Sequence, residues 1–257
     1  MKKSHISFSE LKIWSECPHR HKLDYIDQLR AFKGNEYTAF GKAIHAVGEK
    51  FVFGVDGDEV EEFEANFLYE LKLLKKEDKE ISFNDKLVQE MRPQGAKIAP
   101  QMIPALKEHF GPYGVISAEE QLYEPLAHPG VKFKGFIDLV IKVGQTYHIL
   151  DWKSCTWGWD ARKKSDRILS YQLTLYKHFY AAKHNIDPAD IQTHFALLKR
   201  TSKSKPVEIF EIKCGTKKID NALKLLNTFM YNTKKGNHIK NRLSCKYCPY
   251  MNTKHCT

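Results

Sequence analysis

The sequence has no long hydrophobic run, no low-complexity segment and no internal repeat. Its apolar stretches, such as Phe136–Val143, are interrupted by charge within about eight residues, whereas a membrane-spanning helix needs roughly 18 apolar residues in succession. The first residues lead into a mixed polar helical pattern and lack the apolar centre of a secretory signal. These absences exclude a membrane span and predict a soluble, cytosolic protein.

Acidic residues and cysteines are also comparatively few. Asp and Glu number 31 against 41 Lys and Arg, so the 257 residues carry a formal net charge of +10 at pH 7. This excess points to a polyanionic partner, for which nucleic acid is the simplest candidate. The six cysteines of a cytosolic chain are more often thiols or metal ligands than disulfides. The 42% of hydrophobic residues exclude a disordered chain and are sufficient for a buried core.

The order of the expected elements indicates one α/β domain over residues 1–257. Three short runs rich in β-branched and aromatic residues are separated by turn signals and predict an antiparallel meander, at Val115–Pro125, Val131–Val143 and Thr146–Ser154. Helical periodicity precedes them over 7–25 and 39–53, and residues 54–112 are expected to form a helical insertion. After the meander the pattern predicts a helix, two strands and a last helix, at 166–184, 191–199, 206–214 and 217–231.

Two carboxylates interrupt the apolar strands of this meander. Asp138 lies within Gly135-Phe-Ile-Asp138-Leu-Val-Ile, and Asp151 ends Tyr147-His-Ile-Leu-Asp151. If the two strands pair through a turn at Gly144, the carboxylates lie nearly opposite each other. Such a pair repels and needs a proton or a divalent cation, and Mg²⁺ or Mn²⁺ prefers oxygen ligands. A lone Asp near a strand end is more often a capping or solvated group.

Lys153 follows Asp151 by two residues and therefore shares its face of the strand. At that position its ammonium group could hold an attacking water or neutralise a phosphate oxygen. Glu120, on the first strand of the meander, is expected to be a third acid on the same sheet face. The alternation of charge inside an apolar strand favours a site over a solvated face.

Four motifs, in order along the chain, resemble those of the PD-(D/E)XK nucleases, specifically the RecB-like branch. Gly41-Lys-Ala-Ile-His45 resembles its G-x-x-x-H motif, Gly135-Phe-Ile-Asp138 its G-x-x-D motif, and Asp151-Trp-Lys153 its D-x-K motif. Gln172-Leu-Thr-Leu-Tyr176 is similar to its Q-x-x-x-Y motif. The resemblance implies a restriction-endonuclease-like core, in which helices flank a mixed central sheet.

The resemblance also implies a role for each matched residue. It gives His45, Asp138, Asp151 and the backbone carbonyl of Trp152 to a Mg²⁺ or Mn²⁺ ion. It gives Lys153 to the attacking water or the transition state, and it places Glu120 where the branch often has an acid on its first strand. Gln172 and Tyr176 would orient the lysine and contact DNA, although on the residues alone they could be part of an ordinary amphipathic helix face.

Cysteines gather in the tail at 241–257, where Cys245-Lys-Tyr-Cys248 and Cys256 form a C-x2-C-x7-C pattern. A C-x2-C spacing lets two thiolates bind one metal, and four thiolates suit Zn²⁺ or a [4Fe–4S] cluster equally. The RecB-like resemblance implies a cluster that joins Cys17 to the three cysteines of the tail. If the metal is structural zinc instead, His255 is a possible substitute ligand.

Basic and aromatic residues follow the D-x-K motif. Arg162, Lys163 and Lys164 form a basic segment, and Trp157 and Trp159 precede it. Nucleobases of a single strand stack on such aromatics while lysines and arginines follow the phosphates. The alternative is that these lysines form a solvated face.

Together these features predict a metal-dependent deoxyribonuclease in a bacterial, archaeal or phage-infected host cell. By analogy with the branch, we expect a single-strand exonuclease that leaves a 5′-phosphate and acts in recombination, repair or phage DNA processing. Recombination or replication proteins are the candidate protein partners. A structure-specific endonuclease or nickase with the same site is one alternative. A non-catalytic DNA-binding subunit is the other.

Overall fold

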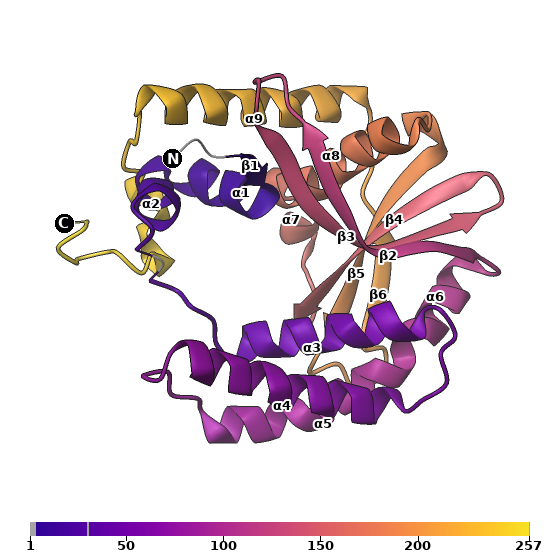
Figure 1. Cartoon of the computed structure of the whole chain (residues 1–257). Coiled ribbons are helices and arrows are strands. Elements are labelled where there is room, and N and C mark those ends of the chain that lie inside the picture. The colour runs from indigo at the N-terminus through magenta and orange to yellow at the C-terminus, as the bar shows by residue number, and fades with distance from the viewer. Residues whose placement is uncertain (1–3, 30, 257) are drawn as a thin grey trace.

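A six-stranded mixed β-sheet, covered by helices on both faces, forms the centre of the molecule (Figure 1). The coordinates are a computed structural model, which describes residues 4–29 and 31–256. The strands are β1 (His5–Ser7), β2 (Gly114–Pro125), β3 (Lys132–Val143), β4 (Thr146–Cys155), β5 (Ile191–Lys199) and β6 (Val207–Glu211). This mixed sheet with flanking helices confirms the predicted α/β class.

The predicted meander is confirmed, because β2, β3 and β4 pair in succession and antiparallel. A two-residue turn joins β3 to β4, with Val143 paired to Thr146 and Gly144 at φ +57°. Glycine adopts this left-handed conformation without steric cost, which explains why the turn forms there. β5 lies parallel to β4 after a helical crossover, and β6 returns antiparallel to β5.

The helices form one layer on each face of the sheet (Figure 1). Their bounds are α1 (Phe8–Glu16), α2 (Pro18–His21), α3 (Glu36–Phe51), α4 (Glu59–Glu77), α5 (Asp85–Ile98), α6 (Met102–Phe110), α7 (Ala161–Lys164), α8 (Arg167–His184) and α9 (Thr216–Lys235). One hydrophobic core lies between the sheet and α1, α8 and α9, and a second lies between the sheet and α3–α6. Among the described residues, no helix is both long and apolar enough to cross a membrane.

The N-terminal segment differs from the single helix expected over 7–25. It contains β1, α1, α2 and a π-helical turn at Lys22–Ile26. Cys17 is extended, at φ −160° and ψ 108°, because a residue before proline is disfavoured in the helical region. β1 forms because Ile6 pairs in parallel with Phe133, a partner more than a hundred residues away that local periodicity could not reveal.

β1 and β4 share one edge of β3. β2 occupies the whole opposite edge, whereas β1 pairs only with Lys132–Lys134 and β4 only with Leu139–Val143. Between them lie residues 135–138, which no described strand covers on this edge. The sheet therefore opens into a fork, and Asp138 lies at its inner end.

Candidate active site

The fork brings the two predicted aspartates together. Leu139 pairs with Leu150 in the last rung of the β3–β4 ladder, so Asp138 and Asp151 occupy the next position. There Trp152 donates its backbone N–H to Oδ2 of Asp138 at 2.7 Å, which replaces the missing rung. Asp138 is 7% exposed and Asp151 is 1% exposed, so both carboxylates are buried at the point where the strands separate.

α3 supplies His45 to the same place. Its apolar residues Phe40, Ile44 and Val47 pack in the lower core, which fixes the helix against the sheet. His45 Nδ1 lies 3.5 Å from Asp138 Oδ2. Burial lowers the pKa of His45. A hydrogen bond to the backbone of Trp152 acts in the opposite direction but has a smaller effect. The predicted ligands His45, Asp138, Asp151 and the Trp152 backbone are therefore neighbours.

On the other side of Asp151, a chain of polar contacts leads to α8. Lys153 Nζ lies 2.5 Å from Asp151 Oδ2. Gln172 Nε2 donates to Asp151 Oδ1 at 2.6 Å and lies 3.3 Å from Tyr176 Oη. Gly135 lets Tyr176 come this close, because a Cβ at position 135 would lie 2.7 Å from Tyr176 Cε1. Both helical residues predicted from the Q-x-x-x-Y pattern thus adjoin the carboxylates.

Glu120 is the one predicted residue that lies elsewhere. Its carboxylate is 2.8 Å from Lys183 Nζ and 2.5 Å from His184 Nε2, at the end of α8. The cause is that β2 is irregular, with a register shift between Val115 and Ser117 and a left-handed φ of +49° at Glu119, so its side chains do not alternate regularly between the two faces. The prediction that Glu120 shares the sheet face of the site is therefore wrong, because an irregular strand does not follow simple alternation.

Its neighbour Glu119 takes the place that Glu120 was expected to fill. Glu119 has φ +49° and lies between residues paired with Leu139 and Ile137, that is, beside Asp138. Glu119 also hydrogen-bonds Glu49 of α3, and this acidic neighbour together with burial raises the pKa of Glu49 to about 8. The sequence carried a signal for Glu49, since it lies four residues after His45 on one helix face.

The site is acidic, and its two aspartates are buried. Burial raises the pKa of Asp138 to about 7 and that of Asp151 to about 6, although Lys153 opposes the shift in both. Repulsion from Asp138 contributes to the shift at Asp151, and repulsion from Glu119 contributes to that at Asp138. Buried carboxylates that repel one another in this way are stabilised by a cation.

The donor types fit a hard divalent cation. Carboxylate oxygens with one imidazole suit Mg²⁺ or Mn²⁺, and Lys153 is the one cation paired with Asp151 Oδ2 among the described residues. Nevertheless, in the described part of the chain no three His, Cys, Asp or Glu side chains are already arranged to hold a metal ion. Binding would therefore require side chains such as Lys153 to move away from the carboxylates.

A second cluster lies at the ends of the chain. Cys17, Cys245, Cys248 and Cys256 line one pocket, and all are free thiols. Hydrogen bonds fasten the tail to the N-terminal segment: Ser244 Oγ donates to the Glu16 carbonyl at 2.7 Å, and Tyr250 Oη donates to Asp24 Oδ1 at 2.6 Å. The structure thus brings the four predicted cysteines to one place, although they do not form a ready metal site.

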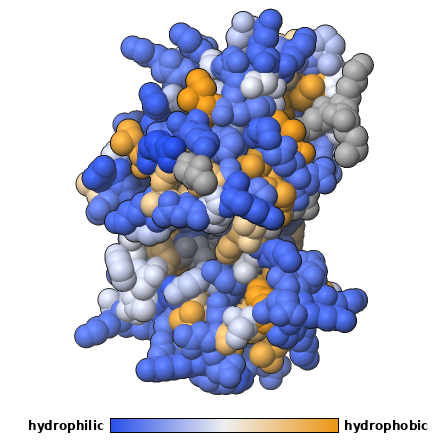
Figure 2. Space-filling view, turned by 90° about the vertical axis from the view of Figure 1, so that its left-hand side faces the viewer, coloured by the Kyte–Doolittle hydropathy of each residue, from blue (hydrophilic) through white to orange (hydrophobic). Residues whose placement is uncertain are grey.

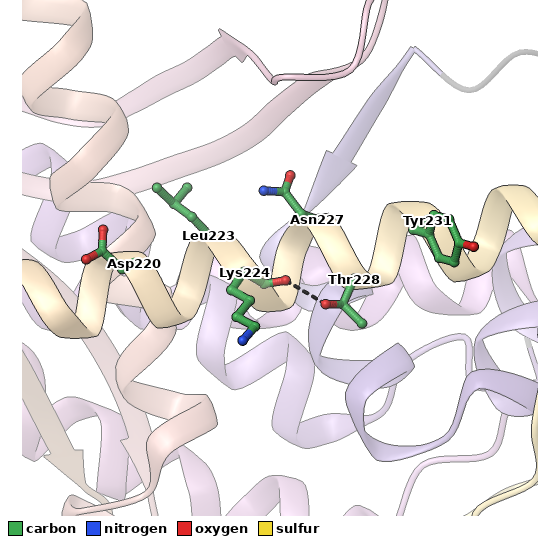
Figure 3. Close-up of a pocket in the computed structure, with 6 residues that line it drawn as sticks. All are labelled: Asp220, Leu223, Lys224, Asn227, Thr228 and Tyr231. Carbon is green, nitrogen blue, oxygen red and sulfur yellow. Dashed lines mark hydrogen bonds between the residues drawn. The ribbon is translucent and has the colours of Figure 1, made fainter.

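The molecular surface has two depressions that are distinct from the cysteine pocket. Viewed from the side of α2, it is hollowed between an upper part that carries α1 and α9 and a lower part formed by α3–α6 (Figure 2). Another depression lies along the exposed side of α9, between Asp220 and Tyr231, and α9 alone lines it (Figure 3). None of the candidate active-site residues lines this second depression.

The comparisons with known proteins agree with this geometry. The family model described as the PD-(D/E)XK nuclease superfamily matches residues 5–253. A crystal structure from Eubacterium rectale, of a protein named "Putative exonuclease", is 13% identical and aligns over 96% of this chain and 88% of its own, with a TM-score of 0.61. At this identity the match shows a shared fold.

Two other results are weaker. The solved structure of SSO0001 is 11% identical and aligns over 97% of this chain and 85% of its own, with a TM-score of 0.44. No curated protein matches the sequence at a significant level.

Replacing Asp138 by Asn should stabilise the metal-free protein above neutral pH. Because its pKa is raised from 3.8 to about 7, the folded state holds a proton that the unfolded state releases, so the carboxylate lowers stability as pH rises across this interval. The gain should reach at most about 4 kcal/mol near pH 8 and vanish near pH 4. Urea denaturation of metal-free protein measures it.

The exposed Asp56→Asn variant is the matched control and should change stability little at either pH. If the Asp138→Asn protein is no more stable than wild type near pH 8, the buried carboxylate does not lower the free energy of unfolding, and the prediction is wrong.

Proposed function

We propose that this chain, which belongs to the PD-(D/E)XK nuclease superfamily, is a metal-dependent deoxyribonuclease that degrades single-stranded DNA from a free end. The observation that carries the proposal is the contact chain His45–Asp138 and Lys153–Asp151–Gln172 at the fork of the sheet. It joins an imidazole, two buried carboxylates and an amine beside an open strand edge. The charge of +10 favours the polyanionic substrate.

Asp138, Asp151 and His45 would hold the metal ion, with the carbonyl of Trp152 as a further ligand. Glu119 and Glu49 are close enough to take part, directly or through water. When bound, Mg²⁺ or Mn²⁺ lowers the pKa of a coordinated water and neutralises charge on the phosphate. The raised pKa values of Asp138 and Asp151 mean that protons compete with the metal below about pH 7.

Lys153 has the central role among the groups of the chain itself. Once its ammonium group leaves Asp151, it can donate hydrogen bonds to the attacking water or to a non-bridging phosphate oxygen. The water oxygen would bond to phosphorus as it releases a proton, and the bond between phosphorus and the 3′ oxygen would break. That oxygen takes up a proton, so the products are a 5′-phosphate and a 3′-hydroxyl. Gln172 holds Asp151 in place during these changes, because it donates to the oxygen that Lys153 does not contact.

Lys153→Ala and Asp151→Ala should each abolish cleavage while DNA binding largely persists. Each change removes one group of the reaction but leaves the basic surface unchanged. The measurement is cleavage of end-labelled single-stranded DNA with Mn²⁺ or Mg²⁺, beside a binding assay in the same buffer. Lys42→Ala is the matched control, since Lys42 is an exposed lysine of α3 that pairs with Glu70. Full activity in either site variant would refute the assignment.

End dependence is tested with circular substrate. An exonuclease should degrade a linear single strand progressively and leave a circular strand of the same sequence intact. Cleavage of the circle would establish an endonuclease with the same site instead. If protein purified without oxygen cuts no linear, circular or duplex DNA, the chain is a binding subunit and the enzyme proposal fails.

We also infer that Cys17, Cys245, Cys248 and Cys256 bind one [4Fe–4S] cluster, because the four thiols line a single pocket. The cluster would fasten the N-terminal segment to the tail and act as a structural crosslink between the two ends of the chain. No redox step is needed for this role.

Anaerobically purified protein should be brown, contain iron and sulfide, and lose thermal stability when Cys248 is replaced by Ser. The control is Cys214→Ser, because Cys214 is a buried thiol that contacts Thr174 at 3.2 Å and lies outside the cysteine pocket. If the protein is colourless and contains one equivalent of zinc, the cluster proposal fails and the four cysteines form a structural zinc site instead.

A further inference from the structure

Trp157 is the most unusual surface residue near the site. Its side chain is 78% exposed, whereas Trp152, five residues earlier, is 1% exposed. Tryptophan side chains are on average largely buried, so the exposed indole of Trp157 is a candidate contact surface for a ligand.

The loop that carries Trp157 is held rigidly. Before it, the Cys155 carbonyl accepts from Arg200 N at 2.9 Å, and the Thr156 carbonyl accepts from Thr201 N at 2.8 Å. Arg200 Nη2 also donates to Thr156 Oγ1 at 3.1 Å, and Arg200 itself is buried. These contacts anchor the backbone immediately before Trp157, while its indole extends into solvent.

This loop adjoins the candidate active site. Trp159, on the other side of Trp157, packs against Phe195 with ring centroids 5.2 Å apart. Lys153 Nζ lies 5.8 Å from the centroid of the same Phe195 ring. Trp157 follows Lys153 by only four residues, so a single strand of DNA bound at Lys153 could extend to the indole.

The surroundings of Trp157 are polar and carry charges of both signs, because Asp160 and Glu208 line the pocket together with basic side chains. The loop and the start of α7 enclose an open pocket of about 570 Å³, whose wall includes Trp157, Trp159 and Lys163. Lys163 lies over the Trp159 ring, 5.0 Å from its centroid, and Lys199 lies against Gly158. Exposed Arg162 adds to this positive charge. An apolar protein surface would not match such a rim, whereas a nucleobase with its phosphate would.

We propose that Trp157 is a stacking platform for an unpaired nucleobase of the DNA strand, while Lys163 and Arg162 contact the adjacent phosphates. The proposal rests on the proposed function for the identity of the polyanion. It adds a physical basis for the single-strand preference, because a base inside a duplex has both faces covered and cannot stack on the indole.

The test measures binding in the Lys153→Ala background, without added metal, so that cleavage does not interfere. The probe is a labelled oligodeoxythymidylate, followed by fluorescence anisotropy and by quenching of tryptophan fluorescence. Trp157→Ala should weaken binding about 5- to 100-fold, and Trp157→Phe should restore most of the affinity because a phenyl ring still stacks. Tyr231→Ala, which removes an exposed aromatic of the α9 depression, is the matched control (Figure 3).

A second comparison separates stacking from phosphate contact. In a second series, a single abasic site is moved along the oligonucleotide. Wild type should bind more weakly when the abasic site is at one or two particular positions. The affinity of Trp157→Ala should not change when the base at those positions is missing. Blunt duplex DNA should bind wild type and Trp157→Ala alike. Equal affinity of wild type and Trp157→Ala for the single strand would overturn the proposal, as would an equal loss on duplex.

These outcomes are independent of catalysis. If Trp157 governs single-strand binding but no substrate is cut, the stacking site stands and the nuclease proposal fails. If DNA is cut and binding ignores Trp157, the nuclease stands, and the exposed indole must serve another partner, such as a protein. Circular dichroism of the variants verifies that the fold persists, which the exposure of Trp157 leads us to expect.

Discussion

The burial of Asp138 and Asp151 beside a single lysine is the constraint on which the rest of the site depends. Two carboxylates in a water-poor environment repel each other and lose hydration, and their raised pKa values express that cost. The surrounding elements compensate only in part: Trp152 N–H binds Asp138, and Lys153 and Gln172 bind Asp151. Glu119 and Glu49 add further negative charge to the same place. A site organised in this way costs the metal-free protein stability, as strained functional sites commonly do.

The fork in the sheet is what makes these groups accessible. A continuous β3–β4 ladder would cover the edge of Gly135–Asp138, and the carboxylates would then be sealed in the sheet. Instead the ladder stops after Leu139 and Leu150, and β1 takes up the edge again only at Lys134. The two hydrophobic cores hold the layers on either side, so the opening is maintained by the packing of α3 below and of α1 and α8 above.

Strand pairing within the meander, the aspartate pair and the D-x-K lysine followed from the sequence because they depend on local patterns: alternation, a glycine turn and fixed spacing. Strand β1 did not follow, because its partner Phe133 is distant in the chain. Glu120 was placed on the wrong face for a related reason. Irregularities in β2 leave little trace in a sequence but interrupt the alternation of its side chains between the two faces.

By itself, the sequence determined the α/β class, the order of the main elements, the excess of positive charge and the kinds of side chain available for chemistry. These features follow from the overall composition and from patterns that extend over only a few neighbouring residues. Only the tertiary structure decided that Glu119 and Glu49 join the aspartates, that four cysteines from both ends of the chain line one pocket, and that Trp157 stands exposed in the loop after β4. Those facts depend on long-range packing and register, which no local pattern encodes.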